Sequence, residues 1–179
     1  AVLLGSGGAG LAYSENPGKV LDAVGRAGGF EVRMVRLDGN ENVSPSAIAA
    51  AVGLGPHVSL LTLDVEGVRE RIEALPWVAE ATVRKIFPRA LDIVLVEAEP
   101  VARWRSEGVE VLVAADGTVL ADRVPFRYRD LPLVAGRGAN AAVGEVIDLY
   151  AAHPDVAPSV AAAVRVNERR WDLLLSGGA

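Results

Sequence analysis

The chain has 179 residues, with no cysteine and only two histidines, His57 and His153. Without cysteine, neither a disulfide framework nor thiolate chemistry is available. Two histidines are few for an enzyme that would hold a metal through imidazole ligands. We therefore expect no metal centre and no cofactor.

The sequence also lacks an excess of basic residues, since its formal net charge is −5. This balance argues against nucleic acid as the main partner. Hydrophobic residues make up 51% of the chain, which is enough for a sizeable core and argues against disorder of the whole chain. The length suits one average domain or two small ones.

A long apolar run is missing, although a short one opens the chain. Residues 1–13 are apolar or small and carry no charge. This run is shorter than the ~20 residues that a membrane helix needs, and it could be the tail of such a helix. Glycine within it is compatible with that interpretation.

Residues 5–10 also match the glycine pattern of dinucleotide-binding proteins, and Asp38 follows a second apolar run, where it could meet a ribose. The pattern requires a long helix after its third glycine. Residues 14–18 instead break the chain less than two turns later, and no strand–helix–strand rhythm follows. We favour the end of a membrane helix or a flexible leader, and a dinucleotide enzyme remains an alternative.

The clearest structural signal lies in residues 75–100, where apolar periodicity and turn residues define a helix stop and a hairpin. The helix ends before Pro76, and strands are predicted for residues 78–84 and 91–97 around a turn at 87–90. Upstream, residues 30–37 predict a strand. Two short helices follow, one capped by Ser44 and one by Asp64. Residues 30–99 therefore predict a compact β-α-α-β-β unit.

After Pro100 the pattern changes to shorter strands. The sequence predicts a strand at 101–104, a hairpin at 109–121 with an Asp-Gly turn, a strand at 131–134, a helix at 141–152 and paired strands at 160–166 and 171–175. The whole chain is thus predicted to be α+β, with a second, mixed β unit that holds one helix. Residues 176–179 are turn material, and we expect this second unit, residues 100–179, to be incomplete at its C-terminal end.

Groups for catalysis are absent from the motifs. No serine lies in a nucleophile elbow. The carboxylate pairs Glu97/Glu99 and Asp116/Asp122 stand at strand exits and hairpin ends, where we expect them to be solvated. Trp77, Trp104 and Trp171 are expected in the core, since no basic patch surrounds them as in a base-stacking platform. We predict no catalytic residue and no enzyme activity.

A series of motifs in fixed order resembles the FtsQ/DivIB family of bacterial cell division proteins, and most closely its alphaproteobacterial members. The motifs are residues 38–40 (DGN), 60–64 (LLTLD), 75–78 (LPWV), 83–88 (VRKIFP), Glu97 with residues 100–102 and Trp104, 116–119 (DGTV), 131–133 (LPL) and 169–173 (RRWDL).

The resemblance implies a non-enzymatic scaffold of the division machinery, the divisome, in the bacterial inner membrane at the septum. Residues 1–13 would end a single transmembrane helix and residues 14–29 would form a juxtamembrane linker. Residues 30–99 would form a periplasmic POTRA domain and residues 100–179 the start of the β domain. The implied partners are FtsB and FtsL. The family continues beyond the Trp171 strand with further strands, the last of which bind FtsB by strand addition.

Two segments are candidates for partner contact. In POTRA-like sheets the strand that corresponds to residues 79–85 is typically exposed, so it could accept an added strand. Arg84 and Lys85 there could equally protect an edge. The candidate residues are Ala79, Ala81, Val83, Arg84 and Lys85, together with Arg169, Arg170 and Trp171. The alternative is a POTRA-bearing component of outer-membrane protein assembly or secretion, which predicts tandem POTRA units and a C-terminal barrel.

Overall fold

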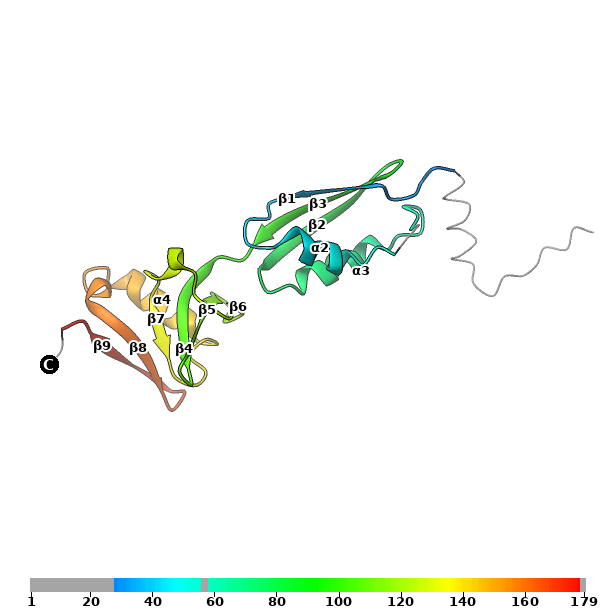
Figure 1. Ribbon diagram of the computed structural model, residues 1–179. Helices are drawn as coiled ribbons and strands as arrows, with labels where there is room; N and C mark the ends of the chain where they lie inside the picture. The colour runs from blue at the N-terminus through cyan, green and yellow to red at the C-terminus, as the bar shows by residue number, and fades with distance from the viewer. Residues whose placement is uncertain (1–27, 56–57, 178–179) are drawn as a thin grey trace, which may run out of the picture.

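The computed structural model describes residues 28–55 and 58–177, which form two α+β units that follow one another along the molecule (Figure 1). The α+β fold class predicted from the sequence is confirmed. The predicted membrane-helix end at residues 1–13, the glycine pattern at 5–10 and most of the predicted linker at 14–29 lie outside the described residues.

The first unit has the predicted element order. Its elements are β1 (Met34–Asp38), α2 (Pro45–Val52), α3 (Val65–Glu73), β2 (Val78–Ile86) and β3 (Ala90–Glu97). The sheet order is β1-β3-β2, with β1 parallel and β2 antiparallel to the central β3. The first strand starts later than the predicted residue 30, because Glu31 pairs only in an isolated bridge with Ser59.

Local signals define both helices. The Ser44 hydroxyl accepts a hydrogen bond from the N–H of Ala47 at 3.2 Å at the start of α2, and the Asp64 carboxylate accepts one from Gly67 at 3.1 Å at the start of α3. At the end of α2, the Arg71 side chain of α3 donates to the carbonyl oxygens of Ala51 and Val52 at 2.8 and 3.0 Å. Arg71 therefore satisfies carbonyl groups that a helix end leaves without partners.

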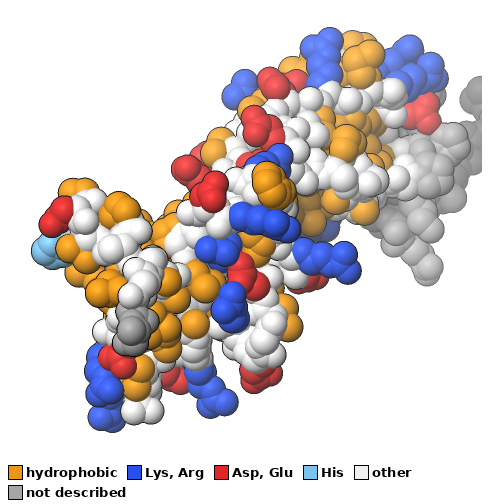
Figure 2. Space-filling model, turned by 60° about the vertical axis from the view of Figure 1, so that its left-hand side comes forward, with side chains coloured by type: hydrophobic (Ala, Val, Ile, Leu, Met, Phe, Trp, Pro, Cys, Tyr) orange, Lys and Arg blue, Asp and Glu red, His pale blue; other side chains and the backbone are white. Residues whose placement is uncertain are grey.

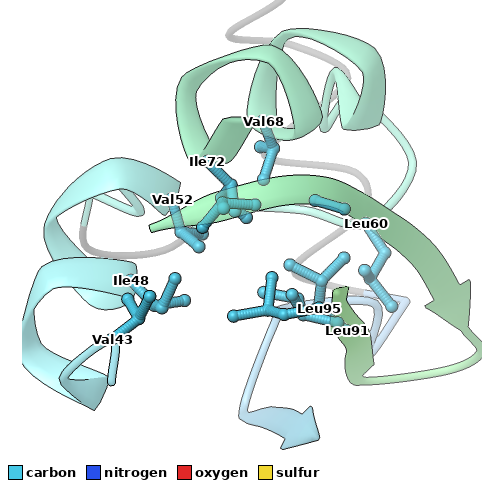
Figure 3. Close-up of a cluster of buried hydrophobic side chains, with 11 residues drawn as sticks. Val43, Ile48, Val52, Leu60, Val68, Ile72, Leu91 and Leu95 are labelled. Carbon is cyan, nitrogen blue, oxygen red and sulfur yellow. The ribbon is translucent and has the colours of Figure 1, made fainter. Parts of the chain in front are cut away.

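The core of the first unit lies between the two helices and one face of the sheet. Figure 3 shows the apolar side chains of α2 and α3 pointing toward those of β3. Ile72, Leu91 and Leu60 are fully buried. Neither helix is long enough to be stable alone, so this shared burial holds the unit together.

The second unit is built on a six-stranded sheet of order β6-β5-β4-β7-β8-β9. Helix α4 covers one face of the sheet by burying Val143 and Val146 against Val134 and Ala163. The elements are β4 (Pro100–Ser106), β5 (Val109–Ala114), β6 (Val119–Ala121), a 3-10 turn η1 (Phe126–Tyr128), β7 (Leu133–Ala135), α4 (Val143–Ala152), a 3-10 turn η2 (Ala157–Ser159), β8 (Val160–Val166) and β9 (Arg170–Leu175).

Only Ala98 and Glu99 separate β3 from β4. The N–H of Ala98 donates to the carbonyl oxygen of Trp77 at 2.9 Å. The Trp77 side chain packs against buried clusters of both units. A short link and a shared aromatic side chain thus connect the two sheets.

Within residues 28–55 and 58–177, no helix combines the length and the apolar character that a membrane crossing requires.

The turn after β1 depends on glycine. Gly39 has φ +80°, and a Cβ there would lie 2.1 Å from the carbonyl oxygen of Leu95. We expect Gly39→Ala to lower the free energy of unfolding by about 3 kcal/mol, because it adds overpacking to a left-handed backbone. Gly108→Ala is the matched control, since Gly108 has φ +85° but no neighbour within 4 Å of the added Cβ. It should cost only about 1 kcal/mol of backbone strain. Urea unfolding measures both, and equal losses would contradict the packing argument.

Candidate functional site

The first candidate surface is the outer edge of β2, which we call the β2 edge. β2 is the last strand of its sheet and pairs on one side with β3, from Glu80↔Val96 to Ile86↔Ala90. Within the described residues no strand pairs with its other side. The strand predicted as a docking edge is therefore an edge strand in the structure.

Strict alternation along residues 78–84 predicts that Ala79, Ala81 and Val83 point to one face of the strand, and this prediction is wrong at Ala79. The register between β2 and β3 shifts between Val78 and Glu80, which marks a bulge. Ala79 is exposed for this reason, whereas Ala81 is buried and Val83 is half-buried against the core. Arg84 is exposed and Lys85 half-buried. Of the three alternate residues, only Ala81 and Val83 face the helices.

The Glu73 side chain of α3 already covers part of the β2 edge. Its carboxylate accepts the N–H of Ala81 at 3.0 Å and also receives the guanidinium of Arg69, which in turn binds Glu66. The Ala81 N–H and then Arg69 lower the pKa of Glu73, so it is ionised at neutral pH. Because backbone groups along a strand alternate in direction, the N–H and C=O of Val83 and Lys85 point the same way as those of Ala81, away from β3.

The second candidate surface is the corner between β8 and β9, which we call the β8–β9 corner. Asn167 and Glu168 have φ of +49° and +55°, and they turn the chain so that Arg169 and Arg170 stand exposed. Arg170 pairs with Asp172 at 3.1 Å. An open hollow at this corner is lined by Arg137, Arg165, Asn167, Glu168 and Arg169. Three arginines against one glutamate make the hollow positive, which favours an acidic partner.

Trp171 is held beneath this corner. Its indole N–H donates to the Glu145 carboxylate of α4 at 2.8 Å, and the Arg165 guanidinium lies 5.4 Å from its ring centroid. Arg165 also reaches Glu145 at 3.3 Å and the carbonyl oxygen of Glu168 at 3.2 Å. Trp171 packs against the core of the second unit, as predicted. Its ring therefore positions the corner more than it offers a contact surface.

The structure does not bring the two sets of predicted contact residues together. The β2 edge belongs to the three-stranded sheet, and β9 is the last strand of the six-stranded sheet in the other unit. We call the region where the two units meet the joint. A partner that uses both surfaces must span this joint.

Sequence reasoning missed the joint itself. The Glu97 carboxylate accepts backbone N–H groups from Glu41, Asn42 and Val43 at 2.8 Å, and the Asn42 side-chain amide at 2.6 Å. The prediction that Glu97 is solvated is wrong, while Glu99 is exposed as predicted. No sequence signal could show this, because the donors lie more than fifty positions before their acceptor.

The second unit reaches the same loop. Arg127 of η1 donates to the side-chain oxygen of Asn42, and its guanidinium lies 4.8 Å from the centroid of the Tyr128 ring. The Tyr128 ring lies 6.2 Å from that of Trp77. The joint therefore consists of a polar contact at Asn42 and an aromatic contact at Trp77.

Asp116 and Glu110 of the second unit also serve as hydrogen-bond acceptors. Thr118 donates its N–H and its hydroxyl to Asp116, each at 2.9 Å, and lowers the pKa of that carboxyl group. Burial raises the pKa of Glu110, but Arg105 and Arg103 lower it further. Among residues 28–55 and 58–177 no group of three or more potential ligand side chains could hold a metal ion.

Comparison with known proteins identifies two matching family models. The POTRA domain model of FtsQ type matches residues 30–98, and the C-terminal model of the cell division protein FtsQ/DivIB matches residues 102–179. The POTRA fold and the family resemblance predicted from the sequence are thereby confirmed.

Curated relatives named cell division protein FtsQ come from several alphaproteobacteria. Those of Bradyrhizobium diazoefficiens and Rhizobium meliloti are each 38% identical, over 157 and 152 residues, and that of Caulobacter vibrioides is 33% identical over 150 residues. The matches cover 88, 85 and 84% of this chain but only 46, 49 and 50% of the relatives. The chain thus spans about half the length of the curated relatives it matches.

The Glu97 contacts predict a pH-dependent stability. Burial raises the pKa of Glu97, but the N–H groups of Val43 and Asn42 lower it below its ordinary value. Its stabilising effect is therefore present above the unfolded-state pKa of ~4.3 and is lost as the pH falls through the lower folded-state pKa. Glu97→Gln should lower the free energy of unfolding by about 2 kcal/mol at neutral pH, because donors lose a charged acceptor.

The difference between the wild type and Glu97→Gln should shrink in acid, as measured by urea unfolding at neutral and at acidic pH. Glu99→Gln is the matched control, because Glu99 is an exposed glutamate two residues further along. A difference that does not depend on pH, or an equal effect of Glu99→Gln, would contradict the assigned role.

Proposed function

This chain belongs to the FtsQ/DivIB family of bacterial cell division proteins, and from that premise we propose that it is a non-enzymatic scaffold of the divisome. In this proposal a single N-terminal helix, whose outer end is residues 1–13, anchors the protein in the inner membrane at the septum. Residues 30–99 and 100–179 lie on the periplasmic side as a POTRA domain and a β domain. The scaffold links early and late division proteins by binding the FtsB–FtsL pair.

The observation that carries this proposal is that all predicted contact residues except Arg169 lie on edge strands. β2 ends one sheet and β9 ends the other, within the described residues. Strand addition to such an edge gains affinity from main-chain hydrogen bonds and specificity from side-chain pockets. A protein that works in this way needs no reactive group.

The ionised carboxylates support the non-enzymatic role. Glu73, Glu97 and Asp116 each hold backbone N–H groups in place, so their lowered pKa values follow from structural hydrogen bonds. A general acid or base at neutral pH needs a pKa near 7, which is a shift in the opposite direction for a carboxyl group.

The two surfaces suit two kinds of contact. The β2 edge offers the outward N–H and C=O groups of Val83 and Lys85 to an extended segment. The β8–β9 corner offers Arg169 and Arg170 to acidic side chains of a partner. Leu174 and Leu175 of β9 are 54% and 55% exposed and add apolar area beside these charges.

The direct test is co-purification of the full-length protein with its own FtsB and FtsL, together with localisation of a fluorescent fusion in dividing cells. We expect both partners to be retained and the fusion to gather at the septum. Absence of association combined with absence of septal enrichment would refute the proposal.

Val83→Pro tests the β2 edge. Proline removes the outward N–H of Val83 but leaves the bonds to β3 intact, so we expect weaker retention of the partners with a preserved fold. Thr82→Pro is the contrasting variant, because the N–H of Thr82 points toward β3 and its loss should destabilise the sheet. Circular dichroism checks the fold. Full partner retention by a folded Val83→Pro variant would exclude this edge.

Arg169→Glu tests the β8–β9 corner. Reversing this exposed charge should weaken partner binding by about tenfold, since like charges across an interface repel. Arg123→Glu is the matched control, because Arg123 is another exposed arginine of the second unit. Pull-down titration measures both, and equal losses would point to net charge and not to the corner.

A further inference from the structure

One end of the first unit combines exposed apolar side chains with basic ones. We call this end the tip and define it as residues 28–36, 58–61 and 84–92. It holds the turn between β2 and β3 and the segment that leads into β1. Figure 1 shows both at the end of the unit that is remote from the second sheet.

Hydrogen bonds and ring contacts hold the tip together. The Phe30 and Phe87 rings meet edge to face with centroids 6.0 Å apart. The N–H of Leu60 donates to the carbonyl oxygen of Phe30 at 2.8 Å, and the N–H of Met34 donates to that of Arg89 at 3.2 Å. The three segments therefore form one surface.

Large apolar side chains of the tip are exposed. Phe87 is 55%, Met34 53%, Leu61 48% and Ile86 40% exposed. Scattered exposed apolar residues are ordinary, but several large ones gathered at one end of a unit indicate a candidate interaction site. Ile86 ends β2 and Phe87 lies in the turn that follows, so their exposed side chains suit a partner that accepts apolar groups without a shaped pocket.

The charge of the tip is opposite to that of the chain. Its basic residues are Arg33, Arg36, Arg84, Lys85 and Arg89, and its acidic residues are Glu31 and Asp92, in a chain of net charge −5. Glu31 lies 3.4 Å from Arg33, and Asp92 is paired in register with both Arg36 and Arg84. Five basic residues against two acidic ones leave the tip with a formal charge of +3. Figure 2 shows Lys and Arg side chains gathered with apolar ones at this end of the molecule.

The tip is also where the described chain begins. Gly28 is the first described residue, and the N-terminal residues 1–27 are joined to it there. The apolar run at 1–13 is therefore tethered to the same end that carries Phe87 and the arginines.

We propose that the tip docks on the surface of a bilayer that contains anionic phospholipids. Phe87, Ile86, Met34 and Leu61 enter the interfacial region, and the surrounding arginines and Lys85 meet the lipid phosphates. Apolar side chains ringed by cations are the composition that binds such a surface. This goes beyond the proposed scaffold role and needs neither FtsB nor FtsL.

Docking through the tip would give the protein a fixed orientation. The antiparallel strands β2 and β3 connect the tip with the joint, so the second unit lies away from the bilayer (Figure 1). The β8–β9 corner is then presented at a distance from the membrane, whereas the distal half of the β2 edge, at Arg84 and Lys85, lies close to it.

The absence of cysteine makes a site-specific test possible. Phe87→Cys and, as matched control, Phe126→Cys are introduced singly into the 179-residue chain and labelled with a nitrobenzoxadiazole fluorophore. Phe126 is 80% exposed but belongs to η1 in the second unit. The probes are phosphatidylcholine vesicles with and without phosphatidylglycerol, some carrying spin-labelled lipids as quenchers.

We expect the label at position 87 to shift to the blue and to be quenched by spin-labelled lipid only on vesicles that contain phosphatidylglycerol. The label at position 126 should remain in water. High salt should reverse the response at position 87, because screening weakens attraction to the anionic surface.

A second pair of variants tests the charges without touching the β2 edge. Arg33→Gln with Arg36→Gln should weaken binding of the label at position 87 to anionic vesicles by on the order of tenfold. Arg123→Gln with Arg129→Gln removes the same charge from exposed arginines of the second unit that lie outside the β8–β9 corner, and should change it little. Circular dichroism confirms that each variant is folded.

A label at position 87 that stays in water on vesicle-bound protein would overturn the proposal. So would an equal response at position 126, an equal response without phosphatidylglycerol, or an equal effect of the two double variants. Partner retention is not part of these readouts, so failure of this inference and failure of the scaffold proposal are distinguishable.

Discussion

Backbone N–H groups of three successive residues, Glu41 to Val43, converge on the carboxylate of Glu97 at the last position of β3. The same loop offers the side-chain oxygen of Asn42 to Arg127 of the second unit. The ionised Glu97 side chain therefore orders the loop that Arg127 of the second unit contacts. Since only two residues link β3 to β4, this contact and the neighbouring Trp77–Tyr128 pair limit how far the sheets can turn relative to each other. The spacing between the two proposed contact surfaces depends on that limit.

The edge strands β2 and β9 differ in whether a side chain already occupies their outward backbone groups. At β2 the Glu73 carboxylate already occupies the N–H of Ala81, and Arg69 holds Glu73 in place. Natural proteins often protect edge strands with such charges, which prevents indiscriminate pairing. A strand added to β2 could pair with outward backbone groups only beyond Ala81, so Glu73 would set its register. β9 has no comparable guard among the described residues, and its apolar Leu174 and Leu175 stand exposed beside Arg170.

Structural features that depend on residues close together in the chain could be predicted from the sequence. The caps at Ser44 and Asp64 and the element order of the first unit follow from short-range chemistry, and the structure agrees. Features set by distant residues could not. The bulge that exposes Ala79 arises from the register against β3, and the late start of β1 from bonds that residues 31–33 make elsewhere. The Glu97 contacts combine both problems, because an ordinary surface glutamate gains its role only through a loop far back in the chain.

The strand order of the first unit also dictates when it can form. β1 lies at one edge and bonds in parallel to β3, with Met34 opposite Ala90, while β2 and β3 form a local hairpin. As the chain is synthesised, β1 and both helices have no sheet to join until β3 has been made, since β3 is the central strand. The first unit must therefore assemble only after β3 has been synthesised, with its other elements packing around that strand. Pairings between segments that are distant in sequence close slowly, so the nascent first unit stays unfolded, and accessible to chaperones, through most of its own synthesis.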